Sequence, residues 1–75
     1  MPMSPTAVSL RVNGAPYDAP ADSSVEHLLR HLGRDPDTPG VAVAVNDAVV
    51  RRALWAETTL RDGDRVEIIT ASQGG

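Results

Sequence analysis

The sequence predicts an α+β domain, a mixed sheet of four to five strands with one main helix packed on one of its faces. Apolar and polar residues alternate in separate segments, one segment carries an apolar stripe with helical spacing, and turn signals lie between the segments. The resulting order is strand, strand, helix, strand, short strand, strand. One helix can cover only one face of such a sheet, so the other face is expected to be open.

Length and composition set limits on this domain. We expect the folded part to span residues 7–70, between a flexible leader (1–6) and a mobile tail (71–75). The chain has no cysteine, so neither disulfides nor thiolate metal sites can stabilise it. Apolar residues make up 41% of the sequence and aromatic residues 3%, so the core must be mainly aliphatic.

The first two strands form a predicted hairpin. Residues 8–12 alternate between apolar and polar side chains, as in a half-buried strand. Asn13 and Gly14 both tolerate positive φ and therefore favour a type I′ turn. The strand at residues 15–19 contains Pro16, which lacks an N–H, so we place this strand at an edge of the sheet.

One segment has the pattern of an amphipathic helix about ten residues long. Ser23 and Glu26 have the spacing of a capping box, in which each side chain accepts a hydrogen bond from a backbone N–H at the helix start. Gly33 stands where a glycine commonly ends a helix. The stripe that faces the sheet has i, i+3, i+4, i+7 spacing and consists of Val25, Leu28, Leu29 and Leu32.

The strands of the second half place small and apolar residues on the open face. In residues 41–45 the valines face the core, while Ala42 and Ala44 share the other face. In the last strand, residues 65–70, Val66 and Ile68 point inward and Ile69 joins the two alanines. Exposed apolar patches often mark protein contacts, so we interpret Ile69, Ala42 and Ala44 as a partner-binding surface. Scattered surface apolar residues, which are ordinary, are the alternative explanation.

Shorter elements connect these strands. A turn at residues 46–47 leads into a brief strand at 49–50. Residues 53–55 predict a short helical turn that places Leu54 or Trp55 over the end of the sheet.

Charge and hydropathy exclude several classes of protein. The net charge is −3, and the seven basic residues are all arginines without a basic stripe, so nucleic acid and anionic membranes are unsuitable partners. The longest apolar run, residues 41–45, is too short to span a bilayer, and no signal peptide opens the chain. We therefore expect a cytoplasmic protein.

The body of the domain lacks the pattern of an active site. His27 and His31 are four residues apart, but they lie opposite the apolar stripe without an evident third metal ligand, so we expect no metal site. Asp62 and Asp64 flank Gly63 and predict a turn. Without cysteine or lysine, a covalently carried group would have to be held by a hydroxyl or a chain terminus.

The carboxyl end is the remaining candidate for chemistry. Gly74 and Gly75 end a segment without apolar anchors, and glycines can lie extended in a narrow channel of another protein. A carboxylate is a poor electrophile, so Gly75 would need activation from outside, most simply as an acyl-adenylate. A partner would use ATP and its own Mg²⁺ for this step. Sulfide or a persulfide could then displace the adenylate phosphate and leave a thiocarboxylate.

Four stretches of the sequence also have a pattern that is typical of a known family. They are Val-Ala-Val-Ala-Val-Asn (41–46) with Val-Val-Arg-Arg-Ala-Leu-Trp (49–55), Leu-Arg-Asp-Gly-Asp-Arg-Val-Glu-Ile-Ile-Thr (60–70), and Gln-Gly-Gly (73–75). Together they resemble the ThiS-like sulfur carriers of thiamine biosynthesis, within the ubiquitin-like sulfur carriers, and the similarity covers residues 8–75. Arg51 stands where proline is common in that family, and Ser72 stands where an apolar residue is usual.

The resemblance implies a β-grasp (ubiquitin-like) fold and a defined cycle. A ubiquitin-activating-enzyme-like adenylyltransferase would adenylate Gly75, and a cysteine desulfurase or other sulfur donor would supply the sulfur. The Gly75 thiocarboxylate would then deliver it to thiazole synthase. The chain would be a protein co-substrate without a bound cofactor, not an enzyme, and Gly74, Gln73 and Ser72 would contact the partner.

Other functions would use the same terminus. A sulfur carrier could serve another acceptor, such as a sulfur-containing secondary metabolite, molybdopterin or cysteine. The molybdopterin branch usually has aromatic residues near the last strand and tail, and this chain has no phenylalanine. A ubiquitin-like modifier would be joined to lysines through Gly75, and an interaction module would have an inert tail.

Overall fold

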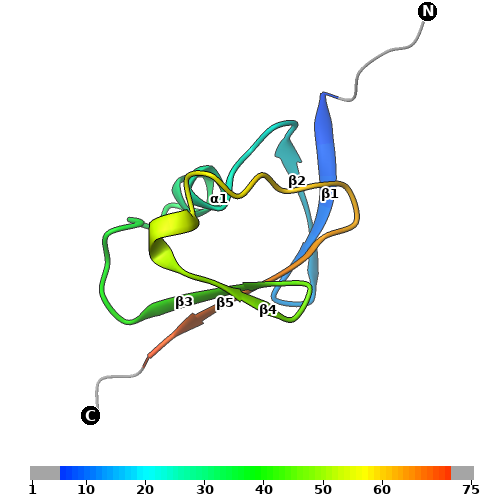
Figure 1. Ribbon diagram of the computed structural model, residues 1–75. Helices are drawn as coiled ribbons and strands as arrows, with labels where there is room; N and C mark the ends of the chain where they lie inside the picture. The colour runs from blue at the N-terminus through cyan, green and yellow to red at the C-terminus, as the bar shows by residue number, and fades with distance from the viewer. Residues whose placement is uncertain (1–5, 72–75) are drawn as a thin grey trace, which may run out of the picture.

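The computed structural model describes residues 6–71 and contains a five-stranded sheet with the order β2-β1-β5-β3-β4. Figure 1 shows α1 on one side of the sheet and β5 between β1 and β3. The elements in chain order are β1 (Ala7–Val12), β2 (Ala15–Pro20), α1 (Val25–His31), β3 (Val41–Val45), β4 (Ala48–Val50), the 3₁₀ helix η1 (Arg52–Leu54) and β5 (Arg65–Thr70). The predicted α+β architecture with a mixed sheet is confirmed.

Two tight hairpins make up most of the sheet. In the first, Val12 pairs with Ala15, so only Asn13 and Gly14 connect β1 to β2, and both have positive φ (51° and 84°). The second repeats this geometry, with Asn46 and Asp47 at φ 51° and 70° between β3 and β4. Positive φ at both positions is the property of a type I′ turn, and it suits the twist of the flanking strands. β2, with Pro16, lies at the sheet edge as predicted.

β5 joins the two hairpins into one sheet. It pairs antiparallel with β3 from Val41↔Thr70 to Val45↔Val66. Its parallel pairing with β1 covers only Arg11↔Arg65 and Val12↔Val66. Beyond the end of β1, the side chain of Asn13 takes over, because its Oδ1 accepts the Ile68 N–H at 2.8 Å. The turn residue therefore extends the support of β5 by two residues.

The core lies between the sheet and α1. Its members are buried apolar side chains from nearly every element: Val8, Leu10, Ala19, Val25, Leu28, Leu29, Val43, Trp55, Leu60, Val66 and Ile68. Each large side chain contributes about 1.5–3 kcal/mol by leaving water. Of the two candidates for covering the end of the sheet, Trp55 is 2% exposed, whereas Leu54 is 46% exposed.

The start of α1 differs from the prediction by one residue. Ser24 caps the helix: its Oγ accepts the His27 N–H at 3.1 Å, and His27 Nδ1 accepts the Ser24 N–H at 3.2 Å. The predicted pair of Ser23 and Glu26 is wrong because Ser23 is engaged elsewhere. Its hydroxyl donates to the Pro20 carbonyl at 2.6 Å, and its own carbonyl accepts the Leu60 N–H at 2.8 Å.

The end of α1 follows the prediction, although the helix has seven residues instead of about ten. Gly33 has φ 78° and donates its N–H to the Arg30 carbonyl at 3.0 Å. The Arg34 N–H donates to the Leu29 carbonyl at 2.8 Å, which completes a Schellman motif. Leu32, the last residue of the predicted stripe, is half-buried against the core.

The contact between Asn13 and Ile68 gives a prediction about stability. Asn13→Gly keeps the positive φ but removes the acceptor, so we expect the free energy of unfolding to fall by about 1–2 kcal/mol. Asn13→Asp retains an oxygen in the same place and should stay close to wild type. Urea unfolding of the three proteins measures both effects. Equal stability of the glycine and aspartate variants would show that the Ile68 N–H does not need this acceptor.

Candidate functional site

The predicted reactive residue lies outside the described part of the chain. This applies to Gly75 and also to the predicted contact residues Gly74, Gln73 and Ser72. The structure does describe the place from which they extend, namely the end of β5 and Ala71. We call Thr70 and Ala71 the tail root. Residues 72–75 follow the tail root directly in the sequence.

The tail root is hydrogen-bonded to the start of β3. The Ala71 N–H donates to the Gly40 carbonyl at 2.7 Å, one position beyond the Val41↔Thr70 pair. Gly40 has φ 79°, a conformation that residues with a Cβ rarely adopt. The first residue of the predicted tail, residues 71–75, is therefore tied to the sheet.

The segment of residues 34–40 contacts the tail root from both of its ends. Arg34, at its start, donates from Nη1 to Thr70 Oγ1 at 3.2 Å, and Gly40, at its end, binds Ala71. Sequence reasoning assigned none of these residues to the site, because exposed loop residues give no signal of which strand they will meet.

The predicted partner-binding surface is only partly accessible. Ile69 is 58% exposed and pairs in register with Ala42, which is also exposed, so these two lie side by side on the open face. Ala44 faces the same way but is only 9% exposed, because its short side chain lies between Glu67 of β5 and Val49 of β4. The accessible apolar surface next to the tail root therefore consists of Ile69 and Ala42. Its role in binding a partner stays a prediction.

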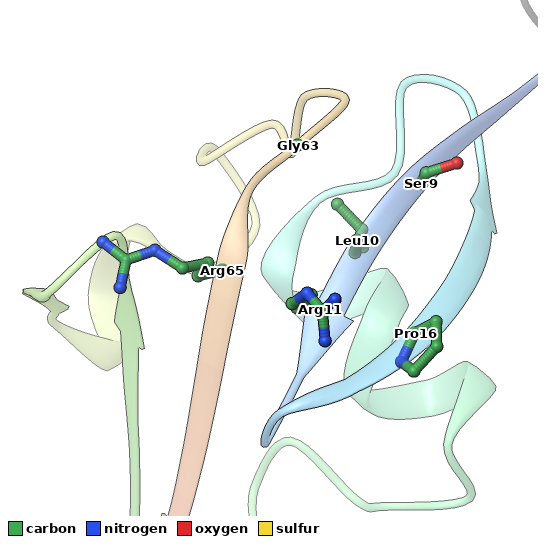
Figure 2. A pocket seen from close by; sticks show the side chains of 6 residues that line it. All are labelled: Ser9, Leu10, Arg11, Pro16, Gly63 and Arg65. Atoms are coloured by element: carbon green, nitrogen blue, oxygen red, sulfur yellow. The ribbon is translucent and has the colours of Figure 1, made fainter.

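A shallow depression of about 410 Å³ lies near the opposite end of β5. Figure 2 shows its lining residues, which are Ser9, Leu10, Arg11, Pro16, Gly63 and Arg65. Arg65 extends away from Arg11 and pairs with Asp47 at 3.0 Å, so the two guanidinium groups do not converge (Figure 2). None of the lining side chains is a carboxylate or an imidazole, so the depression lacks a general acid or base. It also lies five residues along the strand from Thr70, about 17 Å away.

The remaining candidates for chemistry are surface or turn residues. His27 and His31 are exposed on α1, and His27 is engaged with the helix cap. Within residues 6–71, no group of three or more histidine or carboxylate side chains is arranged to hold a metal ion. Asp62 and Asp64 stabilise their turn by accepting the Ser9 N–H at 2.7 Å and the Arg61 N–H at 2.8 Å. In the same part of the chain, no helix is long and apolar enough to cross a membrane.

Comparison with known proteins places the chain in a family. A model described as the ThiS family matches residues 10–75. The chain belongs to the ThiS family. The match runs through Gly75, so the terminal segment is part of what this ThiS-family member shares with its relatives.

Solved and curated relatives agree with this assignment. The crystal structure of the thiamine biosynthesis protein ThiS from Geobacter metallireducens is similar, with a TM-score of 0.76 and 33% identity over 91% of this chain and all of that chain. The predicted β-grasp fold is thereby confirmed. The sulfur carrier protein ThiS of Escherichia coli is 34% identical over 73% of this chain and 80% of its own length.

Two further relatives are not named as sulfur carriers. The uncharacterized protein ycf40 of Pyropia yezoensis is 35% identical over 91% of this chain and 93% of its own length. A thiazole synthase of Magnetococcus marinus is 35% identical over 91% of this chain, but the match spans only 20% of that protein. A domain similar to this chain is thus joined to a longer polypeptide named thiazole synthase.

The positive φ of Gly40 gives a prediction about the tail root. Gly40→Ala should lower the free energy of unfolding by about 1–2 kcal/mol, because an L-residue resists this conformation. Its Cβ would lie 3.6 Å from the Ala71 Cβ, an ordinary contact, so steric overlap adds no cost. Thermal unfolding measures the loss. An alanine variant as stable as wild type would mean that the backbone at residue 40 can relax to negative φ.

Proposed function

We propose that this member of the ThiS family carries sulfur for thiazole formation in thiamine biosynthesis, as a thiocarboxylate on Gly75. The observation that supports this most directly is the family match, which extends through the final glycine pair. The composition agrees with it, since a chain without cysteine or lysine has no internal thiol or ε-amine to carry an acyl or sulfur group.

The proposed chemistry has two steps at the Gly75 carboxyl group, the first at its oxygen and the second at its carbon. The Gly75 carboxylate attacks the α-phosphorus of ATP, and pyrophosphate leaves, so that an acyl-adenylate forms. Sulfide then attacks the acyl carbon and AMP leaves, which gives the thiocarboxylate. With a persulfide donor, the outer sulfur attacks instead and AMP leaves, so that an acyl disulfide forms; a thiol then reduces its S–S bond, which gives the thiocarboxylate and a disulfide between that thiol and the donor. Because a carboxylate is unreactive without activation, a separate adenylyltransferase provides ATP, Mg²⁺ and the catalytic groups. A cysteine desulfurase system supplies the sulfur.

The acceptor in this proposal is thiazole synthase. The relative in Magnetococcus marinus supports the choice, because there a domain similar to this chain belongs to a polypeptide named thiazole synthase. Covalent linkage of a carrier to the enzyme that uses it raises their effective concentration. We propose that the present protein delivers its sulfur to thiazole synthase in the same kind of encounter.

The adenylyltransferase docks, in this proposal, on the open face beside the tail root. Ile69 lies one residue before Thr70 and is 58% exposed, and the neighbouring Ala42 leaves the surface around it flat. Burying an exposed isoleucine against a partner contributes about 1–3 kcal/mol. That contribution offsets part of the cost of ordering the terminal residues in a channel.

This surface gives a prediction about the adenylation step. Ile69→Asp should raise the KM for the carrier about tenfold or more with the fold intact, because it places a charge where an apolar contact forms. Val49→Asp is the matched control. Val49 is 76% exposed on the same face but belongs to the edge strand β4, away from the tail root. Pyrophosphate exchange kinetics measure both variants. If the two variants behave alike, the docking surface is not centred on Ile69.

The carrier role itself is tested by intact mass. After incubation with ATP, Mg²⁺, sulfide and a thiamine-type activating enzyme, wild type should gain the mass of one sulfur in exchange for one oxygen. A chain without Gly75 should gain nothing. If wild type also gains nothing while the enzyme modifies a known carrier, the proposal fails. Conjugates on lysines of other proteins would then favour a protein modifier.

A further inference from the structure

The side chain of Arg52 binds the middle of the segment of residues 34–40. Arg52, in η1, donates from Nη2 to the Thr38 carbonyl at 2.7 Å and from Nη1 to the Pro36 carbonyl. A planar guanidinium can bind two carbonyls at once in this way, whereas an ammonium group acts as a point charge. Pro36 is buried, so one of the two anchored carbonyls belongs to a residue that is packed against the domain.

Arg52 is in turn fixed to the core. Its guanidinium carbon lies 4.7 Å from the centre of the Trp55 ring, within the range of a cation–π contact. Trp55 is almost fully buried, and its Nε1–H donates to the Val50 carbonyl at 2.8 Å, which fixes the orientation of the ring. A continuous set of contacts therefore runs from the core through Arg52 to residues 36–38.

This set of contacts ends at the tail root. Residues 36–38 are only a few residues from Gly40, whose carbonyl accepts the Ala71 N–H at 2.7 Å. At the other end of the segment, Arg34 binds Thr70. The described end of the chain therefore contacts a loop whose middle is bound by Arg52.

We propose that Arg52 is a positioning residue for the carrier reaction. Through residues 34–40 it holds the tail root in the direction that the partner's channel requires. This inference rests on the proposed function of Gly75, because it concerns how the terminal segment is presented. Arg52 itself does not touch the reacting carboxylate in this proposal.

The expected size of the effect follows from conformational entropy. A tail root that is already ordered has less freedom to lose when the terminal segment enters a channel. Releasing the backbone of one residue corresponds to about a fivefold weaker association. Because the contact is equally present before and during the reaction, its loss should raise the KM for the carrier and leave kcat unchanged.

The first test uses the free protein and needs no enzyme. Hydrogen exchange of the Ala71 amide is compared with that of the Leu60 amide, which donates to Ser23 at the core and reports general opening. In Arg52→Met, protection at Ala71 should fall about fivefold relative to Leu60. An unchanged ratio would overturn the proposal, since a purely structural role would affect both amides together. Arg34→Ala, an exposed change that removes the Thr70 contact, should lower the ratio even if Arg52→Met does not fold.

The second test measures KM and kcat for adenylation of each variant. Arg52→Met, and Arg52→Lys with its charge retained, should raise KM about fivefold at constant kcat. Arg51→Met is the matched control, because Arg51 is exposed and its side chain makes no hydrogen bond to the described residues. An unchanged KM in a variant with reduced Ala71 protection would overturn the proposal. If wild type is not adenylated at all, the proposed function is refuted. The hydrogen-exchange result would still show whether Arg52 orders the tail root, because that measurement does not depend on adenylation.

Discussion

The pairing of β5 on both sides is the constraint on which the rest of the structure depends. β1 and β2 form one hairpin and β3 and β4 form another, and β5 is the described strand that pairs with both. Its two inward residues, Val66 and Ile68, lie in the core opposite α1. The strand that ends in the tail root is therefore the central strand of the sheet.

In the proposed cycle, the body of the domain and its terminus have different roles. The described side chains offer no constellation for acid–base or metal chemistry, and the depression near Arg11 lies at the far end of β5. What the body does offer is an exposed apolar residue beside the tail root and a loop that fixes the root from both ends. In the proposed cycle, both features would present the terminus to a partner, and the catalytic groups would belong to other proteins.

Much of the fold followed from local patterns, and the differences have identifiable causes. The type I′ turn at Asn13 and Gly14, the edge position of Pro16, the glycine at the end of α1 and the inward side chains of β5 depend on near neighbours in sequence. The position of the capping box does not depend on near neighbours alone. The Ser23 carbonyl accepts the N–H of Leu60, which is 37 residues away in the sequence (60 − 23). Ala44 is covered for a similar reason, since its neighbours come from two other strands.

The candidate site likewise contains some features that the sequence indicates and others that only the folded structure shows. A terminal glycine pair is visible in the sequence, as is an isoleucine on an open face. The contacts of Arg34 and Arg52 are not, because a backbone carbonyl acceptor has no side-chain identity that could indicate it. Only the folded arrangement brings Arg52 to the carbonyls of Pro36 and Thr38.

The central place of β5 also governs how the chain becomes folded. Asn13 and Ile68 are 55 residues apart, and β1 and β5 can pair only after nearly the whole domain has been made. Before that, each hairpin is a two-stranded ribbon that is marginally stable at best in water. On the ribosome, the sheet cannot close until β5 has left the exit tunnel. Copies cut short within β5 lack the central strand, so they stay unfolded and accessible to proteases instead of competing with intact copies for the same partners.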